Sequence, residues 1–159
     1  MIVVHVFASI LALALGLLIL ALPKGTRTHR TIGAGYTMTM LTLAGTSFFI
    51  YELSGSFTFF HLVSIQTIVL VSIGIALPLL LRRVVAEWHI WHLRMMLYSY
   101  LTLVMTGVST YFDLLPFASN ALNAIVFLQL PAILSFYLIE RRGVRHWRRK
   151  FAHLRSTAA

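Results

Sequence analysis

Residues 2–22 read IVVHVFASILALALGLLILAL, and this run ends at Pro23, Lys24 and Gly25. An apolar run of this length is sufficient to cross the roughly 30 Å hydrocarbon core of a bilayer as one helix. It is too long for the apolar region of an ordinary signal peptide, and no basic segment comes before it. We therefore predict that the chain begins with a retained membrane-spanning helix.

The composition of the whole chain is typical of a membrane protein. Of its 159 residues, 59% are hydrophobic and 11% are charged, against roughly 25% charged residues in soluble domains. The length allows about four to six spanning helices and leaves no room for a separate soluble domain. The chain contains no cysteine, which excludes disulfides, thiolate metal sites and iron–sulfur clusters.

Five apolar segments predict an all-α fold, a polytopic transmembrane helical bundle within residues 1–140. The second segment is rich in small and hydroxyl residues, which favour close helix packing in lipid. We predict that the segment from Arg82 to Arg94 is a loop and that residues 141–159 form a basic cytoplasmic tail. The five predicted spans are residues 2–22, 31–51, 59–81, 93–112 and 122–139.

Basic residues fall on one side of this predicted bundle. The connections 24–30 and 82–94 contain three Lys or Arg each and the tail contains seven, which together are all 13 in the chain. The positive-inside rule then predicts an outside N-terminus and a cytoplasmic C-terminus in a bacterial inner membrane. The net charge of +9 therefore indicates topology rather than nucleic-acid binding. We expect the tail to contact anionic lipid headgroups.

Four histidines are the candidate site residues, because each lies near the end of a different predicted span. At a helical rise of about 1.5 Å per residue, His5 and His61 both lie about 30 Å from the cytoplasmic ends of their helices. They share the outer level, whereas His29 and His92 share the inner level. Small and hydroxyl residues lie beneath them, as expected of faces that point into a bundle. Beneath His5 these residues are Ala8, Ser9, Ala12 and Gly16.

Two imidazoles from different helices at one level predict axial ligation of a b-type haem. The pairs His5 with His61 and His29 with His92 would then form an electron-transfer path across the membrane. The same four histidines are also candidate ligands for copper or zinc. A third interpretation is a non-catalytic membrane binding or assembly protein, in which the bundle and the basic tail dock a partner or a lipid.

No sequence pattern decides whether the protein is an enzyme. The chain lacks a Gly-x-Ser-x-Gly elbow, a phosphate-binding loop and a His-Glu-x-x-His motif. Its only acidic residues are near the predicted span ends, so it also lacks an intramembrane carboxylate pair. A redox partner or a homo-oligomer stays open at this stage.

Short motifs accompany the four histidines. They are His5, Lys24-Gly25 followed by His29-Arg30 and Gly33, Phe60-His61, and His92 with Arg94-Met95-Met96. On these motifs, between His5 and about Tyr100, the chain resembles an uncharacterised bacterial membrane-protein family, the domain of unknown function 2306. The resemblance implies a helical membrane bundle and draws attention to the histidines, but it implies no activity. The layout is also similar to membrane b-type cytochromes, in which paired helices each supply a haem ligand.

Overall fold

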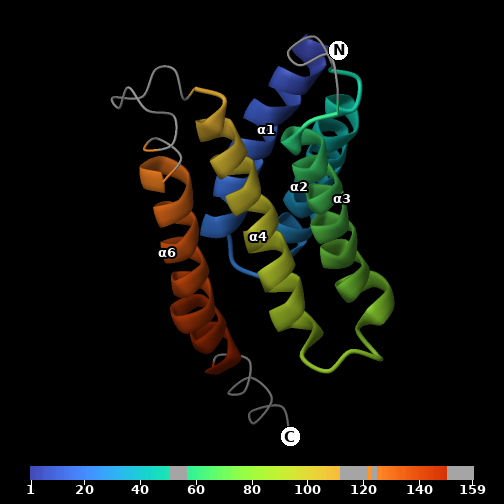
Figure 1. Ribbon diagram of the computed structural model, residues 1–159. Coiled ribbons are helices and arrows are strands. Elements are labelled where there is room, and N and C mark those ends of the chain that lie inside the picture. The colour runs from blue at the N-terminus through green and yellow to red at the C-terminus, as the bar shows by residue number, and fades with distance from the viewer. Residues whose placement is uncertain (51–56, 112–121, 123–124, 150–159) are drawn as a thin grey trace, which may run out of the picture. The chain divides into compact units, whose positions relative to one another are not determined.

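The computed structural model describes residues 1–50, 57–111, 122 and 125–149, and all regular structure among them is helical (Figure 1). The predicted all-α class is therefore confirmed for the described residues. The elements are α1 (Ile2–Ala21), α2 (Arg27–Ser47), α3 (Phe59–Ala76), η1 (Leu77–Leu81), α4 (Trp88–Ser109), η3 (Ile125–Gln129), α6 (Leu130–Leu138) and η4 (Ile139–Val144). The three η segments are π-helical.

The chain divides into two compact units, which are described separately. Unit 1 is Met1–Ile75 and unit 2 is Ala76–Ala159. Two helices among the described residues are long and apolar enough to cross a membrane, Ile2–Ala21 and Phe60–Leu81. They coincide with the first and third predicted spans and indicate membrane association.

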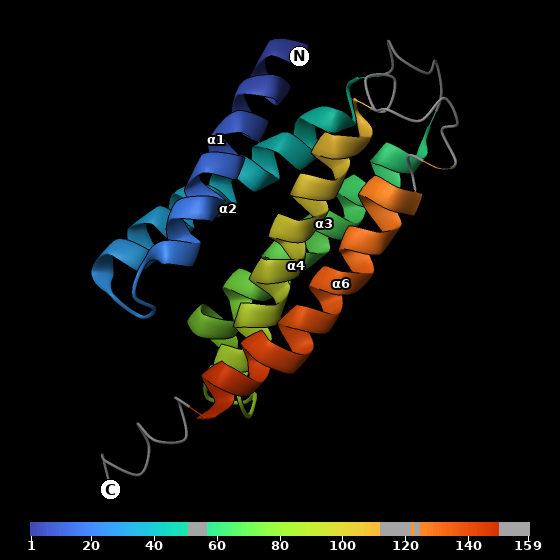
Figure 2. The same ribbon diagram turned by 90° about the vertical axis from the view of Figure 1, so that its left-hand side faces the viewer.

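In unit 1, α1 and α2 run antiparallel and lie side by side (Figures 1 and 2). The buried residues of α1 are Ala8, Ala12 and Gly16, so small residues recur every fourth position and allow a close approach of the two helices. This is the stripe that the sequence predicts beneath His5. The turn between the helices includes Gly25 at φ +82°, a left-handed conformation that suits glycine.

The start of α2 differs from the prediction. The helix begins at Arg27, four residues before the predicted start at residue 31, and ends at Ser47. Thr26 is the N-cap, and its hydroxyl accepts a hydrogen bond of 3.1 Å from the backbone N–H of His29. Apolar composition marks the lipid layer, but the cap decides where the helix begins. The predicted boundary was therefore too late.

In unit 2, α4 lies beside the helix that α6 and η4 form together (Figure 2). The predicted loop from Arg82 to Arg94 was wrong beyond Glu87, because α4 begins at Trp88. The backbone N–H groups of Ile90 and Trp91 both bond to the Glu87 carbonyl. The helix after α6 also continues past the predicted end at residue 139, through η4 to residue 149. The first part of the predicted tail is therefore helical.

Candidate functional site

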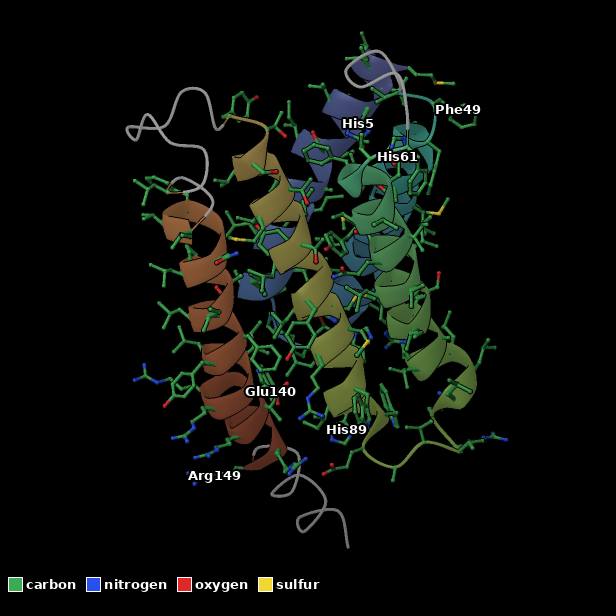
Figure 3. All side chains as sticks on the ribbon, viewed as in Figure 1. His5, Phe49, His61, His89, Glu140 and Arg149 are labelled. Carbon is green, nitrogen blue, oxygen red and sulfur yellow. The ribbon has the colours of Figure 1, made fainter. Side chains whose placement is uncertain are left out.

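Polar side chains join the ends of three helices in unit 1. His5, in the first turn of α1, has its Nδ1 3.1 Å from Oγ1 of Thr46 near the end of α2. The next residue, Ser47, donates a hydrogen bond of 2.6 Å to the hydroxyl of Ser64 in α3. Ser64 lies one turn after His61. Both imidazoles therefore lie at one end of unit 1 (Figure 3).

The Thr46 hydroxyl is a hydrogen-bond partner of the His5 ring. This hydroxyl also lies 2.8 and 2.9 Å from the backbone carbonyls of Thr42 and Leu43. When its single proton goes to one of these carbonyls, its oxygen accepts a hydrogen bond from Nδ1–H of His5. A neutral imidazole with its proton on Nδ1 has a lone pair on Nε2, which is a suitable ligand for iron or another metal. The contact with Thr46 is therefore compatible with a histidine that binds a ligand through Nε2.

His61 has the opposite tautomer. Its Nδ1 accepts the backbone N–H of Thr58 at 3.0 Å, and the Thr58 hydroxyl lies at the same distance. This is the geometry of a capping box, in which the third helical residue reaches back to the N-cap amide of α3. Because Nδ1 accepts an N–H, the proton of the neutral ring is on Nε2.

Aromatic side chains enclose the His61 ring, which is 2% exposed. Phe57 stacks on it with ring centroids 4.9 Å apart and planes inclined by 24°. Phe48 is tilted against it at 6.0 Å. These contacts hold the ring in one orientation, so His61 helps to fix the start of α3.

The two tautomers define what this end of unit 1 can do chemically. With its proton on Nδ1, His5 would offer Nε2 to a metal or a haem iron, whereas His61 presents an N–H. His61 does not fit a second ligand position as it stands, because moving its proton to Nδ1 would break the hydrogen bond from the Thr58 backbone N–H and place two N–H groups against each other. The sequence analysis identified neither Thr46 nor Thr58, although threonines near a helix end are a recognisable signal for such contacts.

The inner histidines belong to different units. His29 lies in the first turn of α2 in unit 1, and His92 lies in α4 in unit 2. Their predicted pairing stays a prediction. Within the described ranges, no three His, Asp or Glu side chains gather as the ligands of a metal ion.

A second polar cluster, in unit 2, was not predicted. Arg94 donates from Nε and Nη2 to the two carboxylate oxygens of Glu140 at 3.0 and 2.8 Å, and the Tyr98 hydroxyl donates to Oε1 at 2.6 Å. Tyr98 stacks on Phe136, and the Arg94 guanidinium lies 4.8 Å from the Trp91 ring centre. The cluster ties α4 to the start of η4.

The charge of Glu140 is stabilised by this cluster. Burial opposes the charge, but the hydrogen bonds from Arg94 and Tyr98 outweigh it, so the pKa of Glu140 lies below its usual value. At neutral pH the pair is therefore ionised. We interpret the cluster as a structural clamp, because its donors and acceptors bond to one another.

Comparison with known proteins adds no relative. No protein-family model matches the chain, and neither a curated protein nor a solved structure is significantly similar to it. The resemblance to the domain of unknown function 2306 therefore stays a prediction from the motifs.

Proposed function

We propose that the protein is a multi-pass protein of the bacterial inner membrane that binds b-type haem at the His5 end of unit 1. The observation that carries this proposal is the 3.1 Å hydrogen bond between Nδ1 of His5 and the Thr46 hydroxyl. A partner on the second ring nitrogen orients a histidine ligand and makes its coordinating nitrogen more basic. Thr46 is such a partner.

The proposed topology has about five spans, an outside N-terminus and a cytoplasmic C-terminus. Helix α1 and the helix Phe60–Leu81 are apolar along their length. Helices α2 and α4 contain 21 and 22 residues, which at about 1.5 Å per residue is sufficient for a bilayer core. The gathering of Lys and Arg in the even-numbered connections supports the orientation.

The residues of the chain have distinct roles in this proposal. His5 would hold the haem iron through Nε2, and Ala8 and Ala12 pack α1 closely on α2 beneath it. His61 would be an N–H donor beside the bound group, because ligation through its Nε2 would require the loss of its bond to the Thr58 backbone N–H. The haem would supply one-electron redox chemistry.

Optical spectroscopy tests this function directly. The full chain is purified from cells supplied with haem precursor, together with His5→Ala, His61→Ala and the control His146→Ala, which changes an exposed residue of the basic helix. We expect a Soret band in the wild type and in His146→Ala, its loss in His5→Ala, and a shifted or weakened band in His61→Ala. A haem-replete wild type without a Soret band would contradict the proposal.

A second candidate, a non-catalytic membrane scaffold, is favoured by the capping role of His61. It predicts that the wild type carries no cofactor and that His61→Ala lowers stability more than His5→Ala, because His61 is buried between Phe48 and Phe57 as well as hydrogen-bonded. The loss of a cap usually costs about 1 kcal/mol. Elemental analysis of the same sample for iron, copper and zinc separates both candidates from a simple metal site.

A further inference from the structure

A basic hollow lies at the C-terminal end of the described part of unit 2. It is a shallow depression that is open to solvent, and its lining residues are Arg141, Arg142, Arg145, His146 and Arg149. These positions are spaced by one, three and four residues along η4 and the helical turn after it, so they share one side of the helix. All five side chains are exposed. Arg149, one of the five, is labelled in Figure 3.

The positive charge of this hollow is not neutralised by the described part of unit 2. Glu140 is bonded to Arg94, and Glu87 is bonded to Arg148 at 3.0 Å. Among the described residues, no carboxylate lies within 4 Å of the four lining guanidinium groups. Like charges at these helical spacings repel one another. The hollow therefore favours an anion that bridges them.

Guanidinium groups indicate phosphate as the anion. Their planar arrangement of donors matches the oxygens of a phosphate, which they bind in a bidentate manner. The Arg141 guanidinium lies 5.0 Å from the Tyr137 ring centre, which limits the orientations that this side chain adopts.

The helix that leads into the hollow indicates that the phosphate belongs to a lipid. On α6, Leu130, Ile133 and Leu134 are 55%, 66% and 57% exposed. An apolar surface followed by a basic hollow matches an amphiphile, with acyl chains along α6 and the headgroup among the arginines. A free phosphate ion would contact only the basic hollow and would leave the apolar surface of α6 unoccupied.

We propose that this hollow binds the headgroup of an anionic phospholipid and prefers a headgroup with two phosphates to a headgroup with one. Four guanidinium groups exceed what one phosphodiester neutralises. A lipid that carries two phosphates engages two pairs of arginines in a single association event, whereas two single-phosphate lipids must be bound separately. The proposal is independent of haem binding.

Lipid binding to the purified full chain tests this site. The probes are tetraoleoyl cardiolipin, dioleoyl phosphatidylglycerol and dioleoyl phosphatidylcholine, added to protein in neutral detergent and measured by native mass spectrometry. We expect affinity to fall in that order. The variant Arg141→Gln/Arg142→Gln/Arg145→Gln/Arg149→Gln should lose cardiolipin affinity by roughly several hundredfold, since each arginine near anionic lipid contributes about a fivefold factor.

A matched control removes the same charge elsewhere. Its four changes are at exposed arginines that line no part of the hollow: Arg27→Gln, Arg30→Gln, Arg82→Gln and Arg83→Gln. This control should keep wild-type preference for cardiolipin. A Lys version of the four hollow substitutions, which keeps charge but removes the bidentate geometry, should bind with intermediate affinity. Circular dichroism checks that each variant is helical. If the Gln variant does not fold, the affinity of the Lys variant for cardiolipin tests the proposal in its place.

Three results would overturn the proposal. The first is equal loss of cardiolipin binding in the hollow variant and the control, which would show a general charge effect. The second is equal affinity for cardiolipin and phosphatidylcholine. The third is inorganic pyrophosphate binding as tightly as cardiolipin, which would assign the hollow to a soluble anion.

Discussion

The substitution Glu140→Gln removes the charge of the carboxylate that ties α4 to η4 but keeps nearly the same side-chain volume. The Glu140 side chain is 28% exposed, and the side chain of its partner Arg94 is 20% exposed. Hydrogen bonds to a charged group contribute about 1.5–3 kcal/mol each when buried, and partial exposure reduces this value. Because Gln can keep the bond from Tyr98, we expect a loss of about 2 kcal/mol in the free energy of unfolding.

The substitution Glu87→Gln is the matched control in the same unit. Glu87 and Arg148 form an ion pair whose side chains are 42% and 55% exposed, and such pairs contribute about 0–1 kcal/mol. Unfolding by a denaturing detergent, followed by tryptophan fluorescence, measures both variants. Equal losses in Glu140→Gln and Glu87→Gln would refute the assignment of the clamp to the Arg94 cluster.

The pH dependence of this clamp has a definite sign. The pKa of Glu140 in the folded chain lies below the value of 4.5 for an unperturbed Glu. A lowered pKa stabilises the fold above the unfolded-state pKa, and this contribution is lost as pH falls through the folded-state pKa. The difference in stability between the wild type and Glu140→Gln should therefore be full at pH 7 and shrink below about pH 4.5.

Three further changes in unit 1 have expected outcomes. Ala12→Leu should destabilise by about 1–3 kcal/mol, since Ala12 is fully buried. Ala14→Leu should have little effect on the same unfolding midpoint, because Ala14 is exposed. Ser64→Ala removes the partner of the 2.6 Å bond from Ser47 and should cost about 1 kcal/mol, whereas an unchanged midpoint would show that the contact is dispensable. Thr46→Val should weaken haem binding by about 10–100-fold in a haem titration, and unchanged affinity would exclude Thr46 as the orienting group.

The all-α class and the buried face of α1 could be predicted from the sequence. Apolar runs indicate which segments are helical, and the small residues beneath His5 predict the face of this helix that points into the bundle, although not that its partner is α2. The starts of α2 and α4 could not be predicted from apolar composition. Both helices begin among polar or charged residues, at Arg27 and Trp88, beyond the apolar stretch that marks a span.

The candidate histidines could be selected from the sequence, but their chemistry could not. Whether His5 or His61 carries its proton on Nδ1 depends on contacts with Thr46 and Thr58, and only the folded chain brings Thr46 to His5 from 41 residues away. The clamp between Arg94 and Glu140 joins residues 46 positions apart. No local sequence pattern indicates this pair, because Arg94 and Glu140 each look like an ordinary charged residue at the end of a membrane-spanning helix.

Titration of the purified apoprotein with haem, followed by addition of imidazole, tests the proposed role of His5 most directly. We expect saturable binding with a Soret shift in the wild type, loss of this binding in His5→Ala, and its recovery in His5→Ala when free imidazole supplies the missing ligand. Wild-type haem affinity in His5→Ala without imidazole would contradict the proposal that the Nε2 lone pair of His5 binds the iron.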